Sequence, residues 1–156
     1  MAVGPVLQRV ERMLGMVAAE KGVAISGAVS EDAVALATDD DVHQILYNLM
    51  ENAIKYSAPE SGFVRVEASV QDGQVVITVT DNGIGIPDED LPRIFDRFYR
   101  VDKMRSREVG GTGLGLSIVK DTIEGRGGAI SAGHGPDGVG TTFTVRLPLA
   151  QREEEA

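Results

Sequence analysis

The chain has 156 residues, a length typical of one domain and sufficient to bury a hydrophobic core. Its net charge of −9, from 24 acidic and 15 basic residues, argues against sequence-independent binding to DNA or RNA, which requires a basic surface. The absence of cysteine excludes a disulfide scaffold, a thiolate metal site and a cysteine nucleophile, and no apolar run approaches the roughly 20 residues that span a bilayer.

The N-terminal part of the chain predicts a helix followed by two strands. Apolar residues recur at three- and four-residue spacing over residues 5–20, which predicts an amphipathic helix, and Gly22 is expected to end it. Residues 23–26 and 33–37 are expected to form short strands separated by a polar turn.

A second helix is predicted over residues 41–56, with Asp39–Asp41 supplying its N-cap and early carboxylates. Residues 63–70 and 74–80 then alternate apolar and polar side chains. Asp72-Gly73 lies between these two runs and predicts a hairpin.

The C-terminal part predicts two more helices and two more strands. A short helix is expected over 94–99 and a long one over 114–124, followed by strands over 129–132 and 141–149 with Gly-Pro-Asp-Gly as their turn. The order of elements indicates an α+β domain, a two-layer α/β sandwich in which helices cover one face of a mixed, mostly antiparallel sheet.

The predicted helix over 41–56 carries a polar stripe. With 100° per residue, Asn48, Asn52 and Lys55 fall within about 60° of one another, beside an apolar stripe for the core. A solvated face is the simpler interpretation, but asparagine is a poor helix former, so two on one stripe suggest a function. Amide oxygens suit Mg²⁺ and a lysine suits phosphate, so the stripe is a candidate phosphate–magnesium site.

A first glycine cluster, Asp81-Asn82-Gly83-Ile84-Gly85-Ile86, follows a predicted strand. A hairpin turn would be the ordinary interpretation of Asp-Asn-Gly, but the residues that follow do not alternate as a strand would. Asp81 is therefore a candidate acceptor for the exocyclic amine of adenine, with Gly83 and Gly85 clearing space for the ring.

A second cluster, Gly111-Thr112-Gly113-Leu114-Gly115-Leu116, opens the predicted helix over 114–124. It lacks the lysine of a Walker A loop and does not follow a strand as a Rossmann loop does. The N-terminus of a helix offers free N–H groups to phosphate, and the basic stretch before the cluster would also attract a triphosphate. These features predict a nucleotide site with a lid.

In the order of its motifs, the chain resembles the catalytic, ATP-binding domain of sensor histidine kinases of two-component systems, within the Bergerat (GHKL) fold shared with gyrase, Hsp90 and MutL. The resemblance covers residues 5–150 and implies an ATP lid over 86–112, with 151–156 as an acidic tail. The matching segments are 44–56 for the N box, 81–86 for G1, 94–100 for the F box, 111–116 for G2 and 138–143 for the last glycine box.

The resemblance also implies roles for single residues and ATP and Mg²⁺ as ligands. Asn52 would hold Mg²⁺ with Asn48 beside it, Lys55 and Tyr56 would contact phosphate, and Asp81 would bind adenine. Arg100 would approach the γ-phosphate, and Arg100 and Asn48 are the candidate catalytic residues. The remaining nucleotide-binding candidates are Gly83, Gly85, Ile86, Tyr99, Gly111, Thr112, Gly113, Leu114, Gly115, Leu116 and Thr142.

One position favours phosphoryl transfer over hydrolysis. Hydrolytic members of this fold carry a glutamate four residues before the Mg²⁺-binding asparagine, and here that residue is Asn48. Glu51 lies about 100° around the helix from Asn52 and is not expected to replace the missing base. An ATPase of the gyrase type, an anti-sigma kinase and a degenerate interaction domain are the alternatives.

The phosphoaccepting histidine of the family is not recognised, because neither His43 nor His134 has the surrounding motif. The resemblance therefore implies that a dimerisation and phosphoacceptor domain, and a response regulator, are the partners, while nucleic acid and direct membrane contact are not expected. The fragment is expected to be a monomer that cannot autophosphorylate alone, cut from a homodimeric, membrane-anchored sensor with this part in the cytoplasm.

Overall fold

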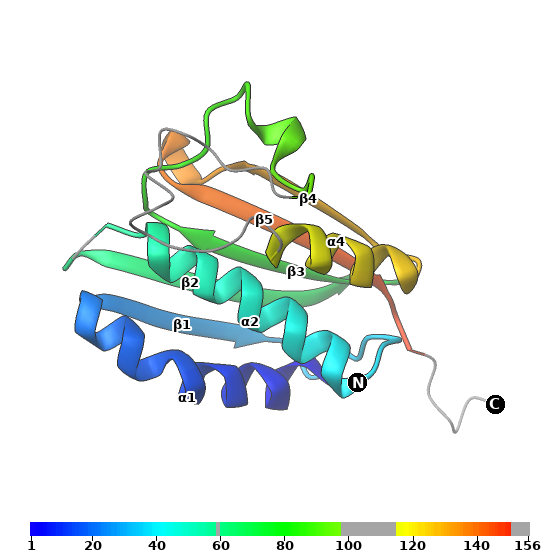
Figure 1. Cartoon of the computed structure of the whole chain (residues 1–156). Coiled ribbons are helices and arrows are strands. Elements are labelled where there is room, and N and C mark those ends of the chain that lie inside the picture. Colours follow the sequence, from blue (N-terminus) through cyan, green and yellow to red (C-terminus); the bar gives the residue numbers. More distant parts are fainter. Residues whose placement is uncertain (59, 98–114, 151–156) are drawn as a thin grey trace.

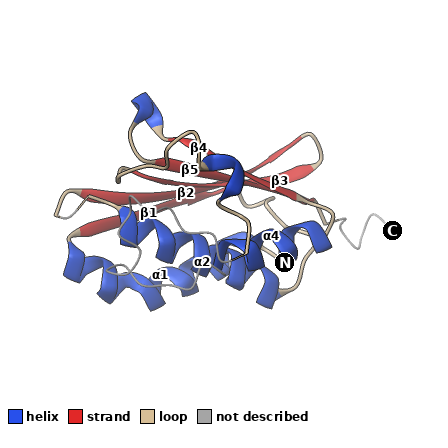
Figure 2. Cartoon of the chain, turned by 45° about the horizontal axis from the view of Figure 1, so that its top comes forward, coloured by secondary structure: helices blue, strands red, loops and turns tan. Residues whose placement is uncertain are grey.

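A computed structural model describes residues 1–58, 60–97 and 115–150. Its helices lie on one face of a five-stranded sheet, which gives two layers (Figures 1 and 2). The helices are α1 (Val3–Lys21), α2 (Asp39–Tyr56) and α4 (Gly115–Gly125), and the strands are β1 (Val23–Val29), β2 (Gly62–Gln71), β3 (Gln74–Asp81), β4 (Ala129–His134) and β5 (Thr141–Pro148).

The sheet is mixed, with the strand order β1-β2-β3-β5-β4. Only the β1–β2 pair is parallel among the described strand pairs, and β2–β3, β3–β5 and β4–β5 are antiparallel. The predicted α+β sandwich with a mostly antiparallel sheet is therefore confirmed. β3 lies at the centre, so its C-terminal residue Asp81 reaches an inner position of the molecule.

The core lies between the sheet and the three helices. α2 packs against both α1 and α4 and against the central strands, so it is covered on more sides than an ordinary surface helix. The residues of its predicted apolar stripe are buried (Val42, Ile45, Leu46, Leu49 and Ala53). Met50 and Ile54, which lie outside that stripe, are also no more than 2% exposed. Burial of this kind holds α2 and its polar stripe at a fixed place above the sheet.

The prediction of a strand over 33–37 is wrong. Among the described residues this segment forms only two isolated bridges, Ala2 to Val34 and Ala35 to Leu149. Its backbone groups pair alternately with the N-terminal residues and with the end of β5, as in the bond from the Leu36 N–H to the Pro148 carbonyl at 2.9 Å. With one isolated bridge to each neighbour, the segment forms a continuous ladder with neither.

The predicted N-cap of α2 shifts by one residue. Thr38 is the cap: its hydroxyl accepts the Asp41 N–H at 3.1 Å, and the Asp41 carboxylate accepts the Thr38 N–H at 3.1 Å. This reciprocal arrangement is a capping box, and it satisfies two backbone donors that the helix start leaves free. Asp39–Asp41 form the first turn, where their charge complements the helix dipole.

The helix predicted over 94–99 is not seen in its described part. A 3₁₀ turn, Leu91–Arg93, comes just before it, and residues 94–97 are not helical. Ile94 is 4% exposed, and Phe95 meets Phe143 edge to face with ring centroids 6.2 Å apart. Contacts of single side chains with the core therefore fix this segment, and six residues are too few to form a helix by themselves.

Candidate functional site

The polar stripe of α2 lies on a half-buried face of the helix. Asn48, Asn52, Lys55 and Tyr56 are all intermediate between buried and exposed, as side chains lining an open site would be. The Asn48 amide donates to the Gln44 carbonyl one turn earlier, at 2.9 Å. This bond fixes the side chain and leaves its oxygen available to another group.

The N-terminus of α4 lies beside Asn48. A Cβ added to Gly115 would come 3.7 Å from Asn48 Oδ1, so the first residue of α4 and the α2 asparagine are in van der Waals reach. Two further contacts hold the helices together: the Thr122 hydroxyl donates to Gln44 Oε1 at 2.5 Å, and Arg126 pairs with Asp41 at 2.6 Å. The start of α4 therefore lies beside the polar stripe of α2, and a helix start is where N–H groups lack partners within the helix.

Asp81 is a buried carboxylate at the C-terminal end of β3. It is 3% exposed, and its Oδ1 accepts the Gly83 N–H at 2.8 Å. Burial raises the pKa of Asp81 above its ordinary value, while hydrogen bonds from the backbone of Gly83 and Thr141 and the charge of Lys21 oppose the rise. An acceptor held in this way, away from bulk water, can discriminate a ligand N–H group strongly.

Glycines line the approach to Asp81 because backbone comes too close for any side chain. A Cβ on Gly83 would lie 1.6 Å from the Tyr56 carbonyl oxygen, and one on Gly140 would lie 1.9 Å from the Asp81 carbonyl oxygen. Gly85 has a φ of +75°, and its Cβ would lie 3.2 Å from the Gly140 oxygen. The end of α2, the first glycine cluster and the start of β5 are therefore in direct backbone contact.

Three more predicted residues are described, two of them near Asp81 and one in α4. Thr142 of β5 is half-buried, and its hydroxyl lies 3.2 Å from that of Thr80, its partner across the β3–β5 pair. Ile86 is 6% exposed and belongs to the core cluster, whereas Ile84 is 65% exposed. Leu116, in the first turn of α4, is half-buried and packs against the core.

The described residues therefore bring most of the predicted site together, at the end of β3 and along α2. Six predicted residues lie outside the described ranges: Tyr99, Arg100, Gly111, Thr112, Gly113 and Leu114. Most of the second glycine cluster and most of the predicted lid lie outside the described residues. The described part of the site comes from α2, the first glycine cluster, β5 and the start of α4.

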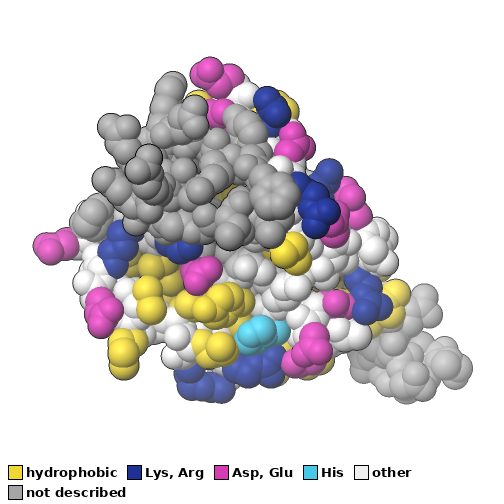
Figure 3. Space-filling view, viewed as in Figure 1, with side chains coloured by type: hydrophobic (Ala, Val, Ile, Leu, Met, Phe, Trp, Pro, Cys, Tyr) yellow, Lys and Arg dark blue, Asp and Glu magenta, His cyan; other side chains and the backbone are white. Residues whose placement is uncertain are grey.

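Both histidines have surface contacts. His43 stacks on Tyr47 with ring centroids 6.0 Å apart. Its Nδ1 lies 3.4 Å from Arg9 Nε, so His43 sits where α1 and α2 meet. His134 Nε2 lies 2.5 Å from the Asp88 carboxylate. Acidic and basic side chains are interspersed on the face that Figure 3 shows.

Sequence reasoning missed two polar residues that support the site. Asn82 bridges to the start of β2, because its amide accepts the Phe63 N–H and donates to the Ser61 carbonyl, both at 3.0 Å. Lys21 donates to backbone at the end of α2. The signal for Lys21 was a lysine in the last turn of a helix, but that position indicates only a favourable helix dipole.

The fold and this site together define a nucleotide-binding domain of the two-layer α/β type. The sequence model of the family described as "Histidine kinase-, DNA gyrase B-, and HSP90-like ATPase" matches residues 37–151, about three quarters of the chain. The chain belongs to this family.

Its similarity to sensor kinases extends to sequence and to structure. The chain is 47% identical over 118 residues to the sensor histidine kinase WalK of Bacillus subtilis, covering 74% of this chain and 19% of WalK. It is 48% identical over 101 residues to the sensor-like histidine kinase SenX3 of Mycolicibacterium smegmatis, covering 65% of this chain and 26% of SenX3. The chain thus spans about a fifth to a quarter of the length of these curated relatives.

Solved structures agree with the fold over nearly the whole chain. The mycobacterial sensor histidine kinase MprB superimposes with a TM-score of 0.83 at 26% identity, covering 95% of this chain and 96% of that one. Full-length ShkA in complex with AMPPNP superimposes with a TM-score of 0.79 at 33% identity, covering 97% of this chain and 31% of that one. None of the described helices is both long and apolar enough to cross a membrane.

Proposed function

We propose that this chain is the ATP-binding catalytic domain of a sensor histidine kinase, and that it transfers the γ-phosphoryl group of Mg-ATP to a histidine on a separate dimerisation and phosphoacceptor domain. The observation that carries the proposal is the placement of Gly115 beside Asn48, together with the buried Asp81 at the end of the central strand β3. The polar amide stripe and the helix start suit phosphates, and the buried carboxylate suits adenine.

In this proposal, adenine binds at Asp81. The carboxylate accepts the exocyclic amine, Gly83 and Gly85 leave room for the ring, and Thr142 and Ile86 flank it. The Gly83 N–H and the burial of Asp81 support this role because they fix an acceptor in one orientation and keep water from competing with the ligand.

The phosphates extend along α2 towards α4. Lys55 and Tyr56 contact them. Further contacts come from the second glycine cluster, namely Gly111, Thr112, Gly113 and Leu114, and from the N–H groups of Gly115 and Leu116 at the start of α4. Tyr99 and Arg100 act from the lid over 86–112, with Arg100 stabilising charge on the γ-phosphate.

The residues present fit Mg²⁺, since amide oxygens are hard ligands and the ion keeps several waters and phosphate oxygens. Asn52 is the proposed ligand, with Asn48 beside it. When bound, the ion would neutralise charge on the phosphates. Asn48 is held by its bond to the Gln44 carbonyl, so its free oxygen has one orientation.

Transfer rather than hydrolysis follows from Asn48, because an amide cannot deprotonate water. In the transfer step, an imidazole nitrogen of the acceptor forms the new P–N bond, the bond between the γ-phosphorus and the bridging oxygen breaks, and ADP leaves. The proposal also sets the domain boundaries at 5–150 and makes a response regulator the next partner. The fragment would be a monomer from a homodimeric parent, and it would lie in the cytoplasm beneath a membrane anchor.

Calorimetric titration and a phosphotransfer assay test the proposal together. We expect Mg-ATP to bind this chain saturably, and Asn52→Ala to lose the Mg²⁺-dependent part of the affinity. Adding the phosphoacceptor domain of the longer protein should then give acid-labile phosphate on that domain, with little release of inorganic phosphate without it. Steady phosphate release by the chain alone would instead favour a hydrolytic ATPase, and label on His43 or His134 would contradict the need for a separate acceptor.

A further inference from the structure

The C-terminal end of α2 is tied down by partners from three parts of the chain. A helix leaves its last four carbonyls without intrahelical partners. Here these belong to residues 53–56, and each has a donor. The Ser57 hydroxyl donates to the Ala53 carbonyl at 2.6 Å. The Ile84 N–H, from the first glycine cluster, donates to the Tyr56 carbonyl at 3.2 Å.

The two carbonyls between them are bound by one side chain from another helix. Lys21 Nζ donates to the Ile54 carbonyl at 2.8 Å and also to the Lys55 carbonyl. A lysine ammonium has three donors and places its charge at the negative end of the α2 dipole. Lys21 therefore binds the turn of α2 that carries the proposed phosphate contacts, although it lies more than 30 residues away in sequence.

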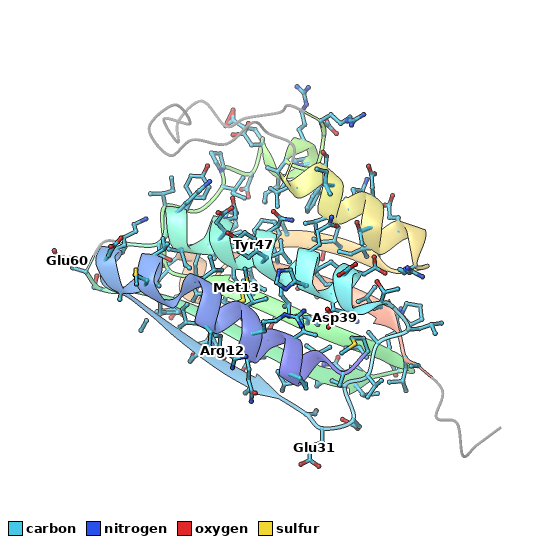
Figure 4. All side chains as sticks on the ribbon, turned by 60° about the horizontal axis from the view of Figure 1, so that its bottom comes forward. Arg12, Met13, Glu31, Asp39, Tyr47 and Glu60 are labelled. Atoms are coloured by element: carbon cyan, nitrogen blue, oxygen red, sulfur yellow. The ribbon has the colours of Figure 1, made fainter. Side chains whose placement is uncertain are left out.

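Lys21 is itself fixed by its backbone. It is the last residue of α1, and its carbonyl accepts the Glu60 N–H at 3.0 Å. Gly22 follows with a φ of +77°, and a Cβ there would lie 2.6 Å from Glu60 Cα, so the α1–β1 corner packs directly on the loop after α2 (Figure 4 labels Glu60 at this corner). A side chain anchored in this way can hold another element in place.

The same contacts lead to Asp81. Gly83 packs on the Tyr56 carbonyl, Ile84 donates to it, and Gly83 donates to the Asp81 carboxylate. Lys21 also acts on Asp81 by charge: burial raises the pKa of Asp81, and Lys21 is among the groups that oppose this. Burial in turn lowers the pKa of Lys21, and Asp81 opposes that change. Position and charge thus connect α1 to the proposed adenine acceptor.

We infer that Lys21 is a positioning residue for adenine recognition: by binding the end of α2 it holds the Gly83–Ile84 backbone, and with it the Asp81 carboxylate, in the orientation that accepts the adenine amine. The inference rests on the proposed function, because it requires that Asp81 binds adenine. It adds a residue of α1 that touches neither base nor phosphate and lies outside the glycine and asparagine motifs.

The test compares two ligands rather than one affinity. ATP is titrated against purine riboside triphosphate, which lacks the exocyclic amine, and the ratio of the two dissociation constants measures how well Asp81 recognises that amine. We expect Lys21→Met to lower the ratio about tenfold, as expected for a weakened hydrogen bond to a charged acceptor. Lys21→Arg keeps both the charge and the donors, and it should restore most of the ratio.

Arg12→Met is the matched control, because Arg12 is exposed on the same helix and its loss removes the same charge (Figure 4). It should leave the ratio within twofold of the wild type. Melting temperatures show which variants are folded, and if Lys21→Met is not, the ratio is read from Lys21→Gln, which keeps N–H donors without charge and should give a smaller fall.

The possible outcomes separate the two proposals. A wild type that binds both ligands, with an unchanged ratio in a folded Lys21 variant, overturns the role of Lys21 and leaves the proposed function standing. A uniform loss of affinity for both ligands also overturns it, since that would be a general structural effect. A wild type that binds neither ligand overturns the proposed function and this inference with it.

Discussion

The two ends of β3 carry nearly the same dipeptide in very different settings. Asp72-Gly73 precedes the strand and Asn82-Gly83 follows it. At the first, both residues have positive φ, of 53° and 75°, and a Cβ on Gly73 would meet nothing within 4 Å. At the second, the φ of Gly83 lies outside the left-handed region, but a Cβ would lie 1.6 Å from the Tyr56 oxygen.

Glycine is thus required for two different reasons. Gly73 supplies a backbone conformation that a two-residue hairpin needs, and its surroundings are open. Gly83 supplies empty space, because the end of α2 presses against it. The comparison shows that an Asx-Gly pair marks either a turn or a site, and that the packing around it decides which.

Gly83→Ala should have the largest effect. The new methyl group cannot coexist with the Tyr56 carbonyl, so the end of α2 or the first glycine cluster must move, at a cost of about 3 kcal/mol, the upper end for overpacking. We expect a lower melting temperature and loss of ATP binding, measured by thermal denaturation and calorimetry. Wild-type affinity and stability in this variant would mean that the close approach is not a feature of the protein in solution.

Asp81→Asn should separate function from stability at the same end of the strand. An amide oxygen can still accept the Gly83 N–H, but it is a weaker acceptor for the adenine amine, so ATP affinity should fall about tenfold to a hundredfold. Calorimetry measures this, and unchanged affinity would remove Asp81 from the adenine site.

The same variant should be more stable than the wild type at neutral pH without nucleotide. Burial raises the pKa of Asp81 above its ordinary 3.8, so the folded state is destabilised once the carboxylate ionises. The advantage of the variant should therefore be absent below the unfolded-state pKa and should grow as the pH rises from there through the folded-state pKa. Denaturation across acidic to neutral pH tests the sign, and an advantage that grows towards low pH would contradict it.

Asn82→Ala should cost less, because it removes hydrogen bonds without introducing a clash. The Phe63 N–H and the Ser61 carbonyl lose their side-chain partners, which predicts a destabilisation of about 1–2 kcal/mol. Denaturant titration measures the change. Gln71→Ala is a suitable control, because the Gln71 side chain is exposed and its described hydrogen bond is a local one to Ser69; it should be within about 0.5 kcal/mol of the wild type.

Gly73→Ala should destabilise the fold about as much as Asn82→Ala, and its effect should be confined to stability. Alanine in a left-handed conformation costs about 1–2 kcal/mol, and the space around the hairpin accepts a methyl group. Affinity for ATP should remain at the wild-type value, since this hairpin lies at the other end of β3 from Asp81. A loss of affinity here would break the distinction between the two glycines.

The fold was largely predictable because its elements follow local rules. Apolar periodicity indicated α1, α2 and α4, alternation indicated β2 and β3, and Asp72-Gly73 indicated the hairpin between them. The segment over 33–37 was misassigned because its run of apolar residues suits a strand, whereas the structure gives it one isolated bridge to each of two distant segments. The burial of Met50 and Ile54 was also missed, because a helical wheel does not show that helices pack on both sides of α2.

The sequence by itself determined the order of the three long helices and the five strands, the polar stripe with Asn48 in place of a glutamate, and the carboxylate at the end of a strand. These depend on residue type and on spacing along a few turns or one strand, which local geometry fixes. Only the tertiary structure decided that Lys21 binds the end of α2 and that Gly115 meets Asn48. It also decided that Gly83 leaves room for the end of α2, whereas Gly73 forms a turn. Those contacts join residues tens of positions apart, and the packing of the three helices on the sheet sets their distances.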